Sequence, residues 1–355
     1  MSSIIGKKLQ LSVFGESHGS VVGATIHGLP AGFKIDRDYI NNELVKRKAK
    51  GGFSTPRIEN DEIEIVSGVF EEYTTGMPLT VIIRNTNFDI KEYNQMKDIP
   101  RPSHADYVAN IKYDGFNDYR GGGHFSARLT APMVAVSAIC KKILAEKGIN
   151  VFSHIKSIGP VVSSDYLTSN KTTVLDEVFP VLNESVRDRF FDELIRVKNS
   201  GDSVGGSVQT IVRGLPVGFG SPIFDTIEGD ISKMIFSIPG VKALEFGRGI
   251  EMSRSIGSVF NDAYTFDGKI KLTSNNCGGV NGGISNGADI VFTTYFKPTP
   301  SIEREQLSVN LKTNERTRLR ITGKHDPCIA VRGVHVVTNL TAFQVLDIYL
   351  HEKEK

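Results

Sequence analysis

The sequence has few cysteines, almost no net charge and no long apolar run, and each shortage excludes a class of protein. Its three cysteines among 355 residues lack CxxC spacing, which argues against a disulfide scaffold or a zinc ribbon and fits a reducing compartment. The formal net charge of +2 at pH 7 provides no overall field that would favour nucleic acid or a membrane. No stretch approaches the roughly 20 apolar residues that span a bilayer, and residues 1–14 lack the apolar core of a secretory signal. We therefore expect a soluble, cytoplasmic protein with no nucleic-acid, membrane or metal partner.

Glycine, in contrast, is abundant. The chain contains 35 glycines in 355 residues, against a usual share of roughly 7%. Several lie in loops with histidine and with cations in or near them, and such loops often bind ligands because glycine lets the backbone approach closely. Four of these segments together predict one composite site for an anionic ligand: residues 15–19 (GESHG), 101–106 (RPSHAD), 120–128 (RGGGHFSAR) and 323–328 (GKHDPC).

Two parts of the chain echo one another. A strand pattern leading into Gly-Leu-Pro-x-Gly-Phe occurs at residues 21–33 and again at 206–219. In both parts a helical pattern, a β-branched strand and a long apolar helix then follow in the same order. We interpret the chain as a single domain over residues 1–355 that contains a diverged tandem repeat, with halves at about 9–150 and 204–352.

The long apolar helix of the first half has clear predicted ends. Ser126 can cap its first amides and Gly148 can end it, so the pattern predicts a helix over 126–147. Its N-terminus beside three glycines would suit a phosphate group. The polar connection over 85–120 is long, and because it contains Arg101 and His104 we interpret it as functional. The other predicted elements are helices at 36–48, 184–199, 225–236 and 334–351, and strands at 79–84 and 290–296.

The segment over 15–19 also matches the G-x-S-x-G pattern of serine hydrolases, with Ser17 as the nucleophile. That motif requires a helix directly after the turn, whereas residues 21–26 are β-branched and predict a strand. A serine hydrolase therefore stays as the less favoured alternative, and His18 could also be a hydrogen-bonded loop histidine. The basic run at 46–50 suits a clamp on a small polyanion better than nucleic acid, because few aromatic residues lie near it. Neither the dinucleotide G-x-G-x-x-G spacing nor a Walker motif is present.

Taken together, seven segments resemble the chorismate synthase family. They follow the family order from residue 6 to about 346, and besides the four segments above they are SIPGVKALEFG (237–247), GGVNGGISNG (278–287) and KPTPS (297–301). The resemblance implies an α+β fold, a β-α-β sandwich with a central helical layer between two antiparallel sheets and an internal tandem duplication. It implies a homotetramer that binds reduced FMN and 5-enolpyruvylshikimate 3-phosphate, and a 1,4-elimination of phosphate that yields chorismate. It also implies a reductant for the flavin, either external or, as in some members, NADPH.

The resemblance assigns roles by motif position. His104 would act at the leaving phosphate, His18 beside the flavin, and Asp326 in proton removal. The substrate-binding positions are Ser17, Arg47, Arg101, Ala127, Arg128 and Lys324. The cofactor-binding positions are His124, Phe125, Ser126, Pro239, Gly240, Gly282, Lys297, Pro298, Thr299, Pro300, Ser301 and Lys324.

Two departures from the family pattern bear on these roles. Lys324 stands where many family members have arginine, and an ammonium group cannot bind phosphate in the bidentate way of a guanidinium. Ser103 replaces a common glycine, which matters only if the backbone there requires a positive φ.

Overall fold

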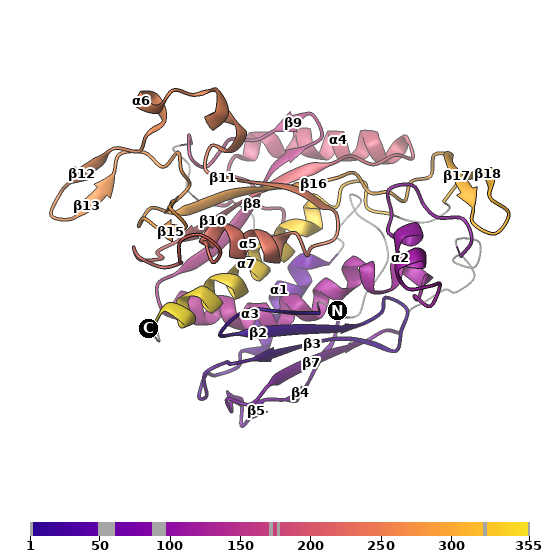
Figure 1. Cartoon of the computed structure of the whole chain (residues 1–355), viewed down its shortest axis with the longest axis horizontal. Coiled ribbons are helices and arrows are strands. Elements are labelled where there is room, and N and C mark those ends of the chain that lie inside the picture. Colours follow the sequence, from indigo (N-terminus) through magenta and orange to yellow (C-terminus); the bar gives the residue numbers. More distant parts are fainter. Residues whose placement is uncertain are drawn as a thin grey trace.

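The protein contains two five-stranded antiparallel sheets with helices between them (Figure 1). The computed structural model describes residues 3–48, 61–86, 97–169, 173–175, 178–321 and 325–353. The strands of the first sheet follow the order β1 (Ile4–Ile5), β2 (Gln10–Gly15), β3 (Val21–His27), β7 (Leu79–Arg84) and β4 (Ile63–Ser67). Those of the second follow the order β11 (Val241–Phe246), β16 (Ile290–Phe296), β10 (Gly206–Arg213), β8 (Asn150–Ile158) and β9 (Val161–Val162).

The two sheets differ in how much of their surface is covered. In β7, Leu79, Val81 and Ile83 are fully buried and alternate with more exposed residues, as expected of a strand with one face on the core. In β10, every residue except the last is buried, because polypeptide covers both faces of the second sheet. The predicted strands at 79–84 and 290–296 coincide with β7 and β16.

The helical layer consists of α1 (Arg37–Arg47), α3 (Thr130–Glu146), α5 (Ile227–Ile235) and α7 (Ala330–Lys353). α3 packs on β3 and β7, α7 packs on β8 and β10, and α3 and α7 pack on each other. All residues from 130 to 140 are buried, because α3 is apolar on every side and is enclosed by both neighbours. The mixed α+β class predicted from the sequence is confirmed.

Local signals place the helix ends within a few residues of the predicted ones. Asp36 caps α1 by accepting a hydrogen bond from the Tyr39 amide at 2.9 Å. Ser126 caps as predicted, accepting from the Arg128 amide at 3.2 Å, but it caps a short 3-10 turn, η4 (Ala127–Leu129), and α3 begins only at Thr130. Gly148 follows α3 with a φ of +76°, the left-handed conformation typical of a helix end.

Smaller elements surround this core. The long connection predicted to be functional contains the helix α2 (Asp106–Lys112), and its residues 87–96 lie outside the described residues. The remaining elements are β5 (Val69–Phe70), β6 (Tyr73–Thr74), η3 (Arg120–Phe125), η5 (Glu184–Val186), α4 (Arg187–Asn199), η6 (Gly249–Arg254), α6 (Gly257–Phe260), β12 (Tyr264–Phe266), β13 (Ile270–Leu272), β14 (Val280–Asn281), β15 (Ile284–Ser285), β17 (Gln306–Asn310) and β18 (Glu315–Leu319).

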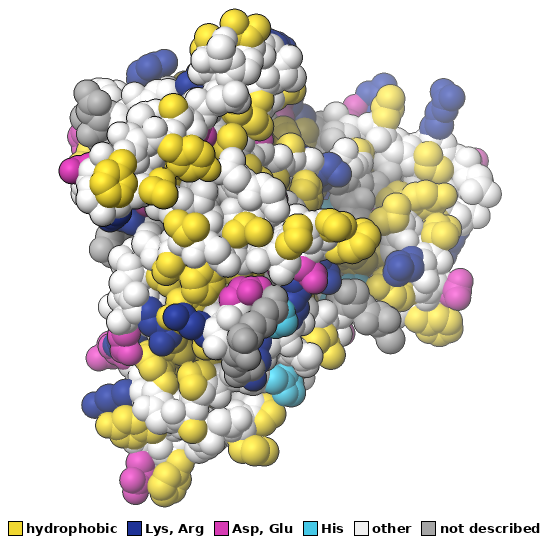
Figure 2. Space-filling model, turned by 60° about the vertical axis from the view of Figure 1, so that its left-hand side comes forward, with side chains coloured by type: hydrophobic (Ala, Val, Ile, Leu, Met, Phe, Trp, Pro, Cys, Tyr) yellow, Lys and Arg dark blue, Asp and Glu magenta, His cyan; other side chains and the backbone are white. Residues whose placement is uncertain are grey.

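An arm formed by residues 249–272 projects from the second sheet (Figure 1). Its apolar side chains are unusually exposed: Ile250 is 73% exposed, Val259 73%, and Phe266 and Ile270 74% each. Figure 2 turns the side that carries the arm toward the viewer, and many hydrophobic side chains cover the upper part of that face.

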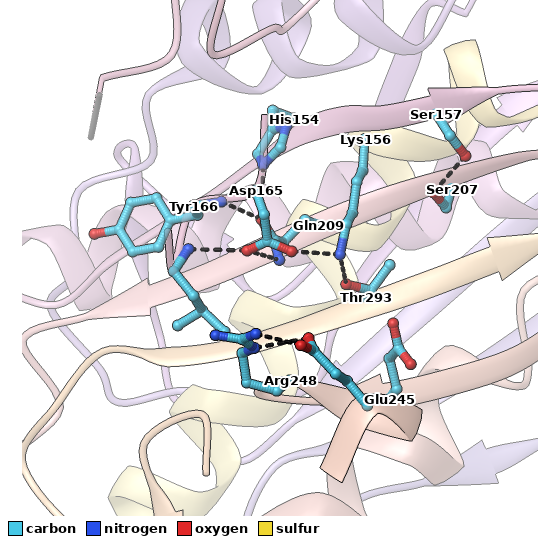
Figure 3. Close-up of polar contacts among 12 residues, drawn as sticks. His154, Lys156, Ser157, Asp165, Tyr166, Ser207, Gln209, Glu245, Arg248 and Thr293 are labelled. Atoms are coloured by element: carbon cyan, nitrogen blue, oxygen red, sulfur yellow. Dashed lines mark hydrogen bonds and ion pairs between the residues drawn. The ribbon is translucent and has the colours of Figure 1, made fainter. Parts of the chain in front are cut away.

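The outer face of the second sheet holds a network of polar side chains (Figure 3). His154 Nε2 lies 3.0 Å from Gln209 Oε1, and the Gln209 amide nitrogen donates to Asp165 at 3.0 Å. Lys156 binds the same carboxylate at 2.6 Å. Burial lowers the pKa of His154 to about 4, so this imidazole is neutral at pH 7. Gln209 and Lys156 fasten the 163–166 loop to the sheet through Asp165. In the described part of the chain, no helix is both long and apolar enough to cross a membrane.

Candidate active site

A cavity of about 680 Å³ lies where α3 and α7 begin. Its wall comes from seven separate parts of the chain, which include all four of the glycine- and histidine-containing segments. The described lining residues are Ser17, Arg47, Ser103, His104, Ala105, Gly121, His124, Phe125, Ser126, Ala127, Arg128, Thr130, Phe236, Ser237, Ile238, Pro239, Gly240, Val241, Lys242, Phe296, Lys297, Thr299, Pro300, Ser301, His325, Asp326, Ile329, Arg332, Gly333 and Val336.

The three consecutive glycines of η3 bring two predicted catalytic histidines to one place. Gly121, Gly122 and Gly123 all have positive φ, at 57°, 83° and 52°. A Cβ atom on Gly121 would lie 2.2 Å from the His18 ring, and one on Gly122 would lie 3.2 Å from the His104 ring. The glycines are therefore required both by the backbone conformation and by the close approach of these two imidazoles. His104 lines the cavity, whereas His18, which is 3% exposed, adjoins it through Gly121.

His104 belongs to a compact group with Asp106 and Arg101. His104 Nδ1 lies 2.6 Å from Asp106 Oδ1. The Arg101 guanidinium donates two hydrogen bonds to the same carboxylate, at 2.7 Å to Oδ2 and 2.8 Å to Oδ1. Although burial opposes it, the hydrogen bonds from Arg101 and His104 hold the pKa of Asp106 well below its usual value. Arg101 also donates to Ser301 Oγ at 3.2 Å and does not itself line the cavity.

Two further arginines meet at a buried carboxylate. Asp61, whose side chain is fully buried, accepts hydrogen bonds from Arg47 Nη1 at 3.4 Å and from Arg128 Nη1. Arg47 also donates to Thr130 Oγ1 at 3.2 Å, and Arg128 Nε donates to Asn85 Oδ1 at 3.0 Å. Both guanidinium groups line the cavity and are held there by these contacts, so they are preorganised to receive an anion.

Asp326 is the only acidic residue among the described lining residues. It accepts a hydrogen bond from Arg332 Nη1 at 2.9 Å. Arg332 Nε donates to the carbonyl of Arg47 at 3.1 Å, so this arginine ties the start of α7 to the end of α1. Asp326 and His104 thus line one cavity, with His18 adjoining it, as the predicted site requires.

The cavity has a positive electrostatic character. Five cationic side chains line it among the described residues, namely Arg47, Arg128, Lys242, Lys297 and Arg332. The N-termini of α3 and α7 add the positive ends of two helix dipoles. Burial and the charge of Arg101 lower the pKa of His325, whose Nε2 is buried and has no hydrogen-bond partner among the described residues. Such a group can receive a hydrogen bond from, or donate one to, a bound ligand.

The predicted cofactor positions fall into three groups. Most line the cavity: His124, Phe125, Ser126, Pro239, Gly240, Lys297, Thr299, Pro300 and Ser301. Pro298 and Gly282 do not line it. Gly282 lies in the turn between β14 and β15, and the carbonyl of the next residue, Gly283, accepts a hydrogen bond from the Ile227 amide at the start of α5. The cavity lies at the opposite end of α5, beside Phe236. Lys324 lies outside the described residues. His124 and Phe125 pack with ring centroids 4.3 Å apart and form an aromatic part of the wall.

Two sequence-based interpretations change with the structure. The serine hydrolase alternative is wrong in its geometry, because the loop holding Ser17 joins the antiparallel strands β2 and β3 and no helix follows it. Ser103, which replaces a common glycine, has a φ of +58°, so the backbone does adopt the left-handed conformation there.

Several residues of the site were not identified from the sequence. They are Asp61, Asp106, Lys242, His325 and Arg332. Asp106 and His325 belong to segments that the sequence analysis singled out, so their position in those motifs could have identified them as site residues. For Asp61 and Arg332 the sequence offered none, because each also binds a distant partner: Arg128 is 67 residues from Asp61, and Arg47 is 285 residues from Arg332.

Known proteins resemble this chain over nearly its whole length. The family model described as chorismate synthase matches residues 9–350. A chorismate synthase of Dehalococcoides mccartyi is 42% identical over 353 residues, which cover 99% of this chain and 97% of that protein. One of Korarchaeum cryptofilum is 42% identical, covering 97% of this chain and 96% of that protein. A crystal structure of chorismate synthase superposes with a TM-score of 0.76 at 28% identity, covering 98% of this chain and 93% of that one. The chain belongs to the chorismate synthase family.

Proposed function

We propose that the protein converts 5-enolpyruvylshikimate 3-phosphate to chorismate by 1,4-elimination of phosphate, with reduced FMN as its cofactor. The observation that carries this proposal is the convergence of His104, Asp326, Arg47 and Arg128 on one cavity, in a chain that matches the family over residues 9–350. The reaction removes a phosphate group and a ring hydrogen without net oxidation. A site for it needs cations for the anionic substrate, an acid for the leaving group and a base for the hydrogen.

Arg47 and Arg128 are the proposed primary contacts of the anionic substrate, because both line the cavity and both are held in place by Asp61. Ser17 and Ala127 line the same wall and are proposed to complete the substrate pocket. Arg101 is a weaker candidate for a direct contact, since Asp106 and Ser301 occupy its guanidinium. Lys324 stays a predicted substrate and cofactor contact outside the described residues.

His104 is proposed to protonate or stabilise the departing phosphate, because an imidazole can donate a proton near neutral pH and this one faces the cavity. Asp326 is proposed to assist removal of the ring hydrogen, with Arg332 fixing the orientation of its carboxylate. His18 is proposed to stabilise the anionic cofactor from behind Gly121.

The residues of the cavity fit reduced FMN. The aromatic pair of His124 and Phe125 offers a surface for a flat ring system. The buried Nε2 atoms of His124 and His325, which have no hydrogen-bond partner among the described residues, could form hydrogen bonds with its polar groups. Lys297, Thr299 and Ser301 would hold its polar groups, and a volume of about 680 Å³ leaves room for a second small molecule. When bound, the reduced flavin supplies reversible electron donation to the substrate ring.

A homotetramer is proposed on the basis of the exposed arm. Ile256, Tyr264 and Phe266 are 67%, 70% and 74% exposed, and several large apolar side chains exposed on one arm are typical of an interface between subunits. Figure 2 shows many hydrophobic side chains on the side that carries the arm. Within one chain, α5 separates Gly282 from the cavity, so Gly282 could contribute to flavin binding only at the cavity of another copy of the chain. We further propose a cytoplasmic location and a reductant for the flavin, either external or NADPH.

We also propose that the fold arose by tandem duplication. The strand order β3-β7-β4 in the first sheet has its counterpart in β10-β16-β11 in the second, within the two predicted halves. Gly28 and Gly214, which end the equivalent strands β3 and β10, have φ values of +81° and +89°. In both, an added Cβ would clash with a backbone carbonyl of the neighbouring segment, at 2.3 and 2.4 Å.

The test is an anaerobic assay of chorismate formation with reduced FMN. Wild-type protein should form chorismate, and His104→Ala should lower kcat by about 10²-fold or more, the usual contribution of an acid–base group. His27→Ala, which removes an exposed histidine at the end of β3, is the matched control and should leave kcat unchanged. Absence of chorismate with the wild type would overturn the function, whereas near-normal turnover of the His104 variant would overturn only its role.

A further inference from the structure

Asp106 is a carboxylate in direct contact with a proposed catalytic histidine, His104. Its Oδ1 lies 2.6 Å from His104 Nδ1, and its side chain is only 11% exposed. We propose that Asp106 is the positioning residue of His104: it holds the ring with the proton on Nδ1 and leaves Nε2 for the substrate. This inference rests on the proposed role of His104 and adds a residue that acts through it.

The contacts of Nδ1 decide which ring nitrogen carries the proton. Arg101 Nη2 lies 3.0 Å from Nδ1 and Asp106 Oδ1 lies 2.6 Å from it. Arginine can only donate and an ionised carboxylate can only accept. An unprotonated Nδ1 would place its lone pair against the nearer, negatively charged oxygen. A protonated Nδ1 instead donates to that oxygen alongside Arg101, so both donors converge on Oδ1. Nδ1 of His104 is therefore protonated whether the ring is neutral or charged, which leaves Nε2 for the substrate. Only the charged ring also carries a proton on Nε2, and that is the proton it would give to the departing phosphate.

Asp106 is rigid enough to act as a support. Arg101 binds both of its oxygens, at 2.7 and 2.8 Å, and the Arg101 backbone amide donates to Oδ2 at 3.0 Å. Arg101 is in turn anchored to Ser301 at 3.2 Å, on the strand-exit segment that lines the other side of the cavity. A carboxylate that is itself held in place by hydrogen bonds fixes the orientation of the imidazole that it contacts.

The backbone brings these side chains together within six residues. The His104 amide donates to the Arg101 carbonyl at 3.2 Å, closing a turn in which Ser103 has a φ of +58°. Asp106 then opens α2, and its carboxylate points back at both Arg101 and His104. The turn is therefore built so that one carboxylate reaches a cation and an imidazole at once.

The competing explanation is that Asp106 only orders Arg101. A double-mutant cycle separates the two explanations, because an effect that passes through His104 must disappear when His104 is absent. Asp106→Asn preserves the shape of the side chain and removes the charge. We expect it to lower kcat by about 10²-fold in the wild-type background, the lower end of what acid–base groups contribute, and to have no further effect in the His104→Ala background.

Glu193→Gln is the matched control for a lost carboxylate–arginine pair. Glu193 binds Arg196 on α4 with the same two distances, 2.7 and 2.8 Å, but contacts no imidazole in the described part of the chain. The Glu193→Gln substitution should leave kcat unchanged in both the wild-type and the His104→Ala backgrounds. If Asp106→Asn does not fold, as judged by its melting temperature, Asp106→Glu replaces it, since the longer side chain keeps the charge but displaces the oxygen from Nδ1.

An equal fall in kcat for Asp106→Asn with and without His104 would overturn the proposal and favour the Arg101 explanation. Unchanged kcat in the wild-type background would overturn it as well. Chorismate formation by the wild type in the same assay separates these outcomes from a failure of the proposed function.

Discussion

The helical layer contains a buried charge whose contribution to stability can be measured through pH. Glu43 in α1 is 2% exposed and sits between three partners. Lys46 Nζ lies 2.9 Å from one carboxylate oxygen, and Lys141 of α3 and Asn339 of α7 lie 3.0 and 2.8 Å from the other. This carboxylate joins the three helices one turn before Arg47, which lines the cavity.

The size of the effect follows from the pKa of Glu43. Burial alone would raise that pKa, but the charges of Lys141 and Lys46 outweigh it and lower the pKa from 4.5 to about 2. At 1.36 kcal/mol for each pKa unit, this difference corresponds to about 3 kcal/mol of folding free energy. Because the folded pKa lies below the unfolded one, the stabilisation is complete above about pH 4.5 and is lost as the pH falls toward 2.

Glu43→Gln keeps the volume and removes the charge, so it should lower the free energy of unfolding by about 3 kcal/mol at pH 7. Urea unfolding of wild type and variant at pH 7, 5, 4 and 3, at one protein concentration, measures the difference, which should shrink below pH 4.5. Glu64→Gln removes an exposed pair with Arg84 at 3.1 Å and should cost at most about 1 kcal/mol. A difference for Glu43→Gln that stays constant from pH 7 to pH 3 would refute the reasoning.

Three further predictions concern the backbone around the site and the chain terminus. Ser103→Gly should raise the unfolding free energy by about 1 kcal/mol in urea titrations, because glycine adopts the φ of +58° without a Cβ penalty; a loss of stability would contradict this. Gly121→Ala should depress kcat far more than Gly115→Ala, since both have positive φ but only the first would clash, at 2.2 Å, with the His18 ring; equal effects would count against a role for His18. Asp347→Ala should cost about 1–3 kcal/mol in the same unfolding assay, because this buried carboxylate accepts three backbone N–H groups at 2.7 to 2.9 Å from residues 7–9; an unchanged midpoint would show that water replaces it.

Much of the fold was predictable because the information is local. The strands β7 and β16 show β-branched runs bounded by turns, and the Ser126 cap and the Gly148 stop depend on one or two residues each. The shift in the start of α3 arises because η4 leaves only a 3-10 turn after the cap, which a cap signal does not distinguish from an α-helical turn.

The site was predictable only in part. The sequence singled out the segments holding His104 and Asp326, and the structure places both at one cavity. It did not reveal that the Arg101 guanidinium binds Asp106 and does not line the cavity. Outside a helix or strand, the spacing of residues does not determine where a side chain points.

By itself, the sequence determined which chemical groups are present and in which order, and therefore the family. Only the tertiary structure decided which of those groups face each other. Asp61 lies between Arg47 and Arg128, and Arg332 links Asp326 to the end of α1, through contacts between segments far apart in the chain. Such contacts form only when both sheets close on the helical layer, since burial in that interior is what makes an unpaired charge costly and so fixes each charged group to its partner.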